Sequence, residues 1–126
     1  MDKELMDKTL PLIIKKIKES KEINPLERPV IVEGEARGAD TLARQWAEEN
    51  GHEVEPHPAK WDEHGKAAGA IRNIEMLSTG VDGVIAYPGG PGTKHMITIA
   101  EAAGVPVYNV YIGGLTDNEE EDVQDE

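Results

Sequence analysis

Cysteine is absent from this 126-residue chain, and its absence excludes several classes of protein. Without thiols there is no disulfide framework, no thiolate nucleophile and no cysteine-based zinc finger, so a reducing compartment is the expected environment. Long apolar runs are also missing, because no stretch approaches the roughly 18 residues that a membrane-spanning helix needs, and the N-terminus lacks the pattern of a signal peptide. We therefore expect a soluble, cytoplasmic protein with no membrane partner.

Basic residues are few, with 13 Lys and Arg against 25 Asp and Glu and a formal net charge of −12. They form no stripe that could displace counterions from a duplex, which argues against double-stranded nucleic acid as a partner. Seven of the acidic residues lie in the last ten positions. We predict one domain over residues 1–116 and a disordered acidic tail over residues 117–126, with a partner-binding role for the tail as the alternative.

Helical and strand patterns alternate along the domain. Leu10, Ile13, Ile14 and Ile17 share one helix face, and Thr9 followed by Pro11 suits a helix start, so a first helix is expected up to Ser20. The further expected helices are 39–50, 71–79 and 94–103, and the expected strands are 30–33, 52–57, 83–87 and 105–112. This order predicts a single Rossmann-like α/β domain, with a mainly parallel sheet of about four strands and helices on both faces.

Two glycine-rich segments each lead from an expected strand into an expected helix: "EGEARGAD" (Glu33 to Asp40) and "PGGPGT" (Pro88 to Thr93). Helix starts present unpaired N–H groups to anions, and glycine lets the backbone approach a phosphate closely. Thr93 could cap its helix or donate its hydroxyl to the same phosphate. Neither segment has the P-loop ending or the dinucleotide-binding glycine spacing. We predict that amides of both loops converge on one anionic group; the alternative is that the glycines only turn a corner.

A third segment, "PAKWDEHGKAAGAIRN", adds Trp61, which could stack on a base or anchor the loop, and Arg72, which could bind a phosphate or carboxylate. His95 could contact the ligand or act as an acid or base. The histidine spacing matches no i, i+4 pair on a helix, so we expect no metal. We also expect no cofactor. The predicted ligand-binding residues are Gly34, Glu35, Ala36, Arg37, Gly38, Ala39, Asp40, Lys60, Trp61, Arg72, Asn73, Pro88, Gly89, Gly90, Gly92, Thr93 and His95.

Three segments together resemble a known family: "EGEARGADTLARQWAEENG", "PAKWDEHGKAAGAIRNIEM" and "DGVIAYPGGPGTKHMITIAEAAGVPV". They are similar to the YspA-type, YpsA-related branch of the SLOG superfamily, which also includes the lonely-guy phosphoribohydrolases and the DNA-processing protein DprA. The resemblance spans residues 30–112. It implies a Rossmann-like domain of bacteria or phages that binds nucleotides or nucleotide-derived ligands, commonly as a homodimer or larger homo-oligomer.

The chain departs from the family pattern at two places. Members usually begin with a strand ending in Gly-Ser-Arg, whereas here the first helix comes directly. In the lonely-guy enzymes the loop reads Pro-Gly-Gly-x-Gly-Thr-x-x-Glu. Its glutamate works with an arginine of the preceding helix to cleave the N-glycosidic bond of the substrate. Arg72 matches that arginine, but Met96 stands at the glutamate position. A thioether cannot transfer a proton, so catalysis by this route should be lost. The carboxylates that could substitute are Glu33, Glu35, Asp40 and Glu75.

The residues and the resemblance together favour a module that binds a nucleotide, or a signalling derivative of one, without turnover. One alternative is a nucleotide hydrolase of the phosphoribohydrolase type, for which Arg72, Glu75 and His95 are the candidate catalytic residues. A further alternative is an interaction protein of phage or bacterial conflict systems that sequesters a signal nucleotide.

Overall fold

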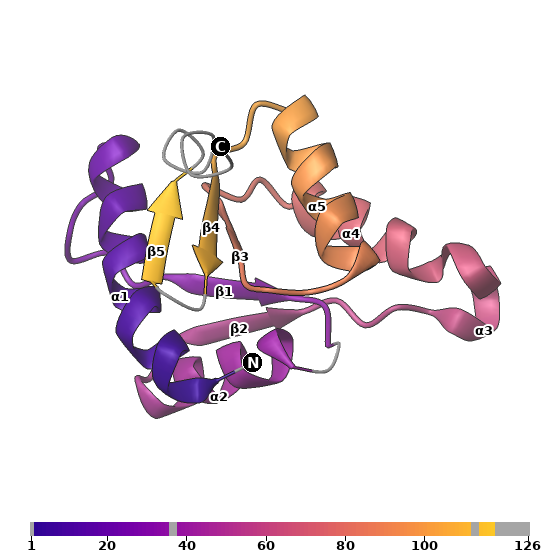
Figure 1. Cartoon of the computed structure of the whole chain (residues 1–126), viewed down its shortest axis with the longest axis horizontal. Helices are drawn as coiled ribbons and strands as arrows, with labels where there is room; N and C mark the ends of the chain where they lie inside the picture. Colours follow the sequence, from indigo (N-terminus) through magenta and orange to yellow (C-terminus); the bar gives the residue numbers. More distant parts are fainter. Residues whose placement is uncertain (1, 36–37, 112–113, 118–126) are drawn as a thin grey trace.

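The α/β class predicted from the sequence is confirmed by the computed structural model, which describes residues 2–35, 38–111 and 114–117 (Figure 1). The helices are α1 (Lys3–Ser20), α2 (Ala39–Glu49), α3 (Trp61–His64), the 3-10 helix η1 (Gly65–Ala67), α4 (Ala68–Ser78) and α5 (Pro91–Ala102). The strands are β1 (Val30–Glu33), β2 (Glu53–Pro56), β3 (Val84–Ala86), β4 (Val107–Tyr111) and β5 (Gly114–Asp117).

The four strands expected from the sequence form two parallel pairs rather than one sheet. β1 pairs with β2, with Val30 opposite Glu53, and β3 pairs with β4, with Val84 opposite Val107. β4 also pairs with β5 in an antiparallel ladder that the sequence pattern did not predict. Among the described residues no ladder joins β1 to β3. The space between these two strands is instead a cleft, lined in part by side chains of α1 and α4.

The first helix starts earlier than the sequence analysis expected. It begins at Lys3, and the Asp2 side chain caps it by accepting a hydrogen bond of 2.9 Å from the Glu4 amide. Pro11 therefore lies inside α1, and its placement at a helix start was wrong. Fully buried Met6 extends the apolar face formed by Leu10 and Ile13, and this burial outweighs the backbone hydrogen bond that a proline removes.

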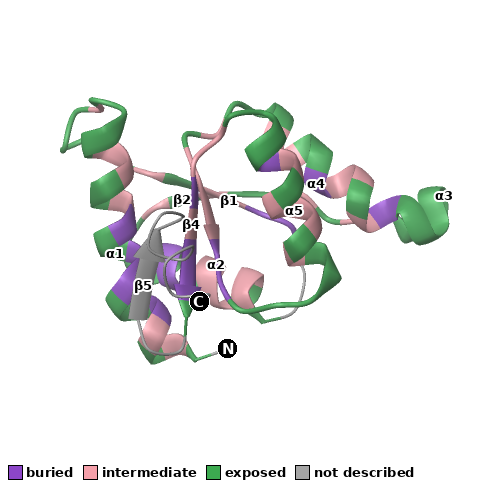
Figure 2. Ribbon diagram, turned by 45° about the horizontal axis from the view of Figure 1, so that its top comes forward, coloured by how far each residue is buried: buried purple, intermediate pink, exposed green. Residues whose placement is uncertain are grey.

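Different helices cover the two sheets, but the larger of the two hydrophobic clusters includes residues of both sheets. α2 packs on β1 and β2, whereas α5 packs on β3, β4 and α4. Figure 2 shows buried positions both along α1 and between α4 and α5. The larger core cluster consists of Met6, Leu10, Ile13, Trp46, Ala47, Tyr87 and Val110. The smaller one consists of Ala86, Ala100 and Val107. Because the larger cluster contains Val110 of β4 together with residues of α1 and α2, it connects the two sheets.

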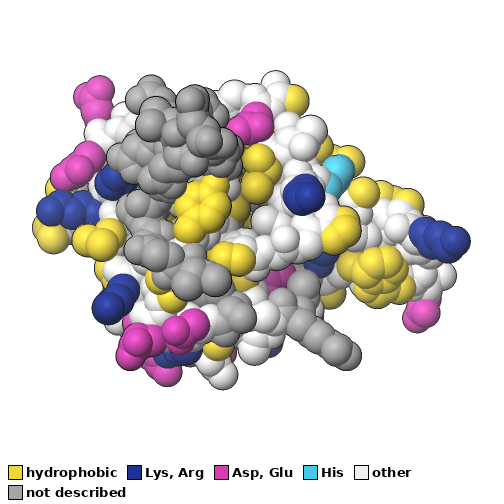
Figure 3. All heavy atoms as spheres, in the orientation of Figure 1, with side chains coloured by type: hydrophobic (Ala, Val, Ile, Leu, Met, Phe, Trp, Pro, Cys, Tyr) yellow, Lys and Arg dark blue, Asp and Glu magenta, His cyan; other side chains and the backbone are white. Residues whose placement is uncertain are grey.

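Three further predictions concern the acidic tail, the distribution of basic side chains on the surface and the absence of a membrane-spanning helix. β5 ends at Asp117, and residues 118–126 of the predicted tail lie outside the described residues. On the face drawn in Figure 3, Lys and Arg side chains are scattered among acidic and apolar ones rather than gathered into a stripe. Of the helices in the described part of the chain, none has both the length and the apolar character needed to cross a membrane.

Candidate functional site

The cleft between β1 and β3 has a volume of about 940 Å³ and brings both glycine-rich loops to its wall. One is the β1–α2 loop (residues 34–38), and the other is the β3–α5 loop (residues 87–90). Each follows the carboxyl end of a parallel strand, where α/β folds place ligands. The predicted binding residues that line this cleft are Gly38, Ala39, Asp40, Arg72, Asn73, Pro88, Gly89, Gly90, Gly92 and Thr93.

The start of α5 presents backbone N–H groups that no side chain caps. Gly90 is the N-cap residue and Pro91 follows within the first turn, where proline's missing N–H costs no helical hydrogen bond. Thr93 therefore does not cap the helix, which leaves the second role predicted for its hydroxyl. An added Cβ at Gly89 would collide with the Thr93 side chain, 3.2 Å from its Cβ. This close approach favours glycine at position 89, directly before the amino end of α5.

The β1–α2 loop differs because the protein's own carboxylates hold two of its amides. The Gly34 amide donates to Asp40 Oδ2 at 3.2 Å, and the Glu35 amide donates to Glu33 Oε1 at 2.6 Å. Glu35 also has a left-handed backbone with a φ of 54°, which is costly for a residue with a side chain. These two amides, predicted to face a ligand, are thus already paired. Ala36 and Arg37 lie outside the described residues.

Glu33 is the most deeply buried carboxyl group at the cleft, with only 2% of the residue exposed. Its Oε2 atom accepts no hydrogen bond and lies 3.5 Å from Arg44 Nη2, in an ion pair whose arginine side is partly exposed. Burial raises the pKa of Glu33, although the Glu35 amide and the Arg44 charge oppose the shift. Desolvation is therefore the dominant effect on this carboxyl group.

Two consecutive residues of α4 hold one carbonyl from each side of the cleft. Arg72 Nη1 donates to the Gly34 carbonyl at 2.6 Å, and Asn73 Nδ2 donates to the Gly92 carbonyl at 3.1 Å. Asn73 Nδ2 also lies 3.1 Å from His95 Nδ1. An added Cβ at Gly34 would lie 2.6 Å from Arg72 Nη1, so Gly34 must be glycine for this contact. Arg72, predicted to bind a phosphate, thus also fixes the β1–α2 loop.

Other predicted site residues are not among those that line the cleft. Lys60 and Trp61 lie at the start of α3, which extends away from the sheets in Figure 1, and Trp61 is 59% exposed. Glu35 is exposed, and His95 reaches the site only through its contact with Asn73. Glu75, named as a substitute carboxylate, is exposed on α4 and is likewise outside the lining.

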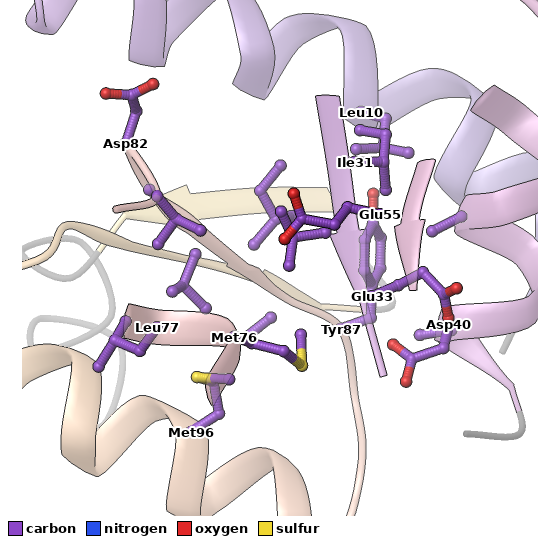
Figure 4. Close-up of a pocket in the computed structure, with 18 of the residues that line it drawn as sticks. Leu10, Ile31, Glu33, Asp40, Glu55, Met76, Leu77, Asp82, Tyr87 and Met96 are labelled. Atoms are coloured by element: carbon purple, nitrogen blue, oxygen red, sulfur yellow. The ribbon is translucent and has the colours of Figure 1, made fainter. Parts of the chain in front are cut away.

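The sequence analysis did not name Tyr87 as a site residue, and it named Glu33 only as a possible substitute for the missing glutamate. Tyr87 is buried at the end of β3, its hydroxyl is 2.8 Å from Thr9 Oγ1, and burial raises its pKa to about 12. Glu33 is the last residue of β1, Tyr87 directly follows β3, and each precedes a loop, a position that is itself a signal for a site residue. Figure 4 shows Glu33, Asp40 and Tyr87 near one another at the carboxyl end of β1. In the described ranges, no group of three or more acidic or histidine side chains is placed to hold a metal.

Comparison with known proteins places the chain in a family. The profile of the YspA, cpYpsA-related SLOG family matches residues 5–64. The Gene 61 protein of Mycobacterium phage D29 is 47% identical over 87 residues, which cover 64% of this chain and 70% of the phage protein. The chain belongs to the YspA, cpYpsA-related SLOG family. The resemblance seen in the sequence is thereby confirmed, and no solved structure matches this SLOG chain.

The part of the SLOG chain matched by the family profile contains one of the two loops. Residues 5–64 run from α1 to the end of α3 and include the β1–α2 loop. The β3–α5 loop lies beyond the match, so its role depends on the geometry described above. Membership of this family points to a nucleotide-related function, and the phage relative's printed name states no ligand.

Proposed function

We propose that this SLOG chain binds a nucleotide-type ligand in the cleft between β1 and β3, with a phosphoryl group at the amino end of α5, and does not turn the ligand over. The observation that carries the proposal is the uncapped start of α5 on the cleft wall, next to Gly89 and Gly90. Unpaired amides and the positive end of the helix dipole stabilise a bound anion there.

The rest of the cleft suits the apolar part of such a ligand. Its walls include Ile31, Ile85 and Met76, from β1, β3 and α4. A volume of about 940 Å³ is within the range of small-molecule sites, which combine apolar walls with a few polar groups. Arg72 adds the positive charge of its guanidinium to the wall. A phosphoryl group and an apolar ring system on one ligand would use both parts of the cleft.

The absence of turnover is proposed because of Met96. This residue lines the cleft at the position where the resemblance to the lonely-guy enzymes implies a glutamate. A thioether neither accepts a proton nor carries the negative charge that stabilises a cationic sugar centre. The ligand is therefore expected to leave unchanged.

A hydrolase that cleaves the N-glycosidic bond is the second candidate function, because Glu33 is a buried carboxyl group with a raised pKa in the same cleft. A carboxyl group of this kind can act as a general acid. Release of free base from nucleoside monophosphates, abolished by Glu33→Gln, would support this candidate over simple binding. Continued absence of base release at every pH tested would exclude it.

The binding proposal is tested by calorimetry of the full chain with nucleoside monophosphates, cyclic nucleotides and ADP-ribose. Amide NMR then locates the site: the Gly92 and Thr93 amides should shift most, whereas the Gly34 and Glu35 amides, already hydrogen-bonded, should shift less. If none of these compounds binds, the proposal is wrong. Binding with the largest shifts around exposed Trp61 would also contradict it.

A further inference from the structure

We infer that Tyr87 is a positioning residue for the ligand site, and that it acts by donating a hydrogen bond to Thr9, which fixes the β3–α5 loop against α1. The inference rests on the proposed function, because this loop leads to the start of α5, where the phosphoryl group is placed. It goes further by making ligand affinity depend on Thr9, a residue of α1 that does not line the cleft.

The direction of the hydrogen bond between Thr9 and Tyr87 follows from a third group. Thr9 Oγ1 lies 2.8 Å from the carbonyl oxygen of Leu5 and 2.8 Å from the hydroxyl oxygen of Tyr87. A carbonyl oxygen can only accept, and a threonine hydroxyl has a single proton, so Thr9 donates to Leu5. The Tyr87 hydroxyl is therefore the donor to Thr9.

Burial ties the Tyr87 hydroxyl to this acceptor. Thr9 is 4% exposed and Tyr87 is 7% exposed, so water does not easily replace either partner. In Figure 4 the Tyr87 ring lies beside Leu10, the neighbour of Thr9 in α1, and both belong to the larger core cluster. A buried hydroxyl that loses its acceptor retains the full cost of its desolvation. The bond to Thr9 thus holds the Tyr87 side chain at α1.

The β3–α5 loop is held at both of its ends. Tyr87 is its first residue, so the bond to Thr9 fixes the start of the loop. Beyond its other end, Asn73 Nδ2 donates to the Gly92 carbonyl at 3.1 Å and fixes the first turn of α5 to α4. Between these two anchors lie Gly89 and Gly90, and a glycine backbone has a wide range of allowed conformations. The position of the loop amides therefore depends on the anchors.

Loss of the Tyr87 anchor should lower affinity by loosening the free loop. A loop that samples other positions is competent to bind in only a fraction of the molecules, and the observed affinity falls by that fraction.

The two ways of removing the bond are not equivalent. Thr9→Val leaves the buried Tyr87 hydroxyl without an acceptor, so the hydroxyl gains by moving toward water and takes the start of the loop with it. Tyr87→Phe removes the hydroxyl itself, and Thr9 still donates to Leu5, so no buried donor is left unpaired. Thr9→Val should therefore weaken binding more than Tyr87→Phe.

The test measures the affinity of the full chain for the best-binding nucleoside monophosphate by calorimetry, where circular dichroism shows each variant to be folded. We expect the affinity to fall about tenfold in Thr9→Val and about threefold in Tyr87→Phe. Thr9→Ser keeps the hydroxyl and should bind within about twofold of the wild-type chain. Ile13→Val is the matched control, because Ile13 is fully buried on α1 in the same core cluster but does not line the cleft. It should lower stability and leave affinity unchanged.

NMR order parameters of the Gly89 and Gly90 amides supply a readout that needs no ligand. They should fall in Thr9→Val, recover in Thr9→Ser and stay unchanged in Ile13→Val. Unchanged affinity and order parameters in both Thr9→Val and Tyr87→Phe would overturn the inference while leaving the proposed function intact. An equal loss of affinity in Ile13→Val would overturn it too, because the loss would then follow stability alone. If no nucleotide binds to the wild-type chain, the proposed function is wrong, and unchanged order parameters in Thr9→Val would still overturn the positioning role of Tyr87.

Discussion

The β1–α2 and β3–α5 loops share one topology but differ in what holds their amides. Both follow a short parallel strand, contain glycine and lead into a helix at the same cleft. In the first loop, the Glu35 and Gly34 amides donate to the Glu33 and Asp40 side chains, whereas no described side chain accepts from an amide of the second loop. The N-cap residues of both following helices are glycines without a side-chain cap. The difference traces to the last strand residue: β1 ends in a buried carboxyl group, and β3 ends in Ala86. Glycine content alone therefore does not identify an open anion site.

The largest effect is expected from Gly89→Ala, which changes the open loop. The added Cβ would meet the Thr93 hydroxyl and lie 3.2 Å from Thr93 Cβ, so the Thr93 side chain must rotate and the first turn of α5 must shift slightly. We expect ligand affinity to fall at least about tenfold and stability to fall by about 1–3 kcal/mol, as for other overpacked sites. Calorimetry with the best-binding monophosphate and urea unfolding measure the two losses.

Gly90→Ala is the control for this substitution, because a Cβ there has no neighbour within 4 Å. It should retain stability. If Gly89→Ala binds as well as the wild-type chain, the open loop does not form the site.

A smaller effect on binding is expected from Gly34→Ala, the equivalent change in the self-occupied loop. Its Cβ would lie 2.6 Å from Arg72 Nη1, so the hydrogen bond from Arg72 to the Gly34 carbonyl should break. We expect stability to fall by about 1–3 kcal/mol but affinity by less than about tenfold. A loss of affinity as large as that of Gly89→Ala would mean that both loops hold the ligand directly.

The pH dependence of the free energy of unfolding should report on the β1–α2 loop, because Glu33 is the buried carboxyl group at its start. Burial raises the pKa of Glu33 above its ordinary 4.5, so the folded state holds this proton more tightly than the unfolded state does. Ionising Glu33 therefore costs stability as pH rises through its folded pKa, and this cost is absent below pH 4.5. In urea unfolding from pH 4 to pH 8, the free energy of unfolding of Glu33→Gln should increase relative to that of the wild-type chain as pH rises. If this difference increased toward acid pH instead, the pKa of Glu33 would not be raised in the folded state.

The smallest effect is expected from Glu35→Gly. Glu35 has a φ of 54°, a left-handed conformation that costs a residue with a Cβ about 1 kcal/mol. Glycine should recover roughly 0.5–1 kcal/mol of stability in thermal melts, because it adopts this φ without a clash. Glu22→Gly, at a φ of 56° after α1, is the matched control: it should stabilise similarly without touching the cleft. Destabilisation by Glu35→Gly alone would show that the side chain of Glu35 has a role of its own.

Much of the fold follows from periodicity and glycine positions, since β1, α2 and β2 lie within a residue of their expected bounds. The start of α1 was missed because a proline usually marks a helix start, and here the burial of Met6 overrides that preference. The division into two sheets was missed because strand patterns indicate which residues are extended but not which edges pair. Among the described residues no ladder joins β1 to β3, and residues of α1 and α4 line the space between them.

The meeting of the two glycine-rich loops at one cleft was largely predictable, but the state of their amides was not. Strand-to-helix order places both loops at one end of the strands, and both line the cleft. Whether an amide is free depends on side-chain distances such as the 2.6 Å between the Glu35 amide and Glu33 Oε1. The position of Trp61 on a projecting helix could not be predicted either, because it depends on tertiary packing. The sequence around Trp61 is equally compatible with a residue that stacks on a ligand.

Arg72 and Asn73 are neighbours in α4, yet each holds a backbone carbonyl from a different side of the cleft. A small rotation of this helix would therefore reshape both walls together. A substitution on the outer face of this helix, such as at exposed Ile74, that shifts the helix would therefore move both walls without contacting either.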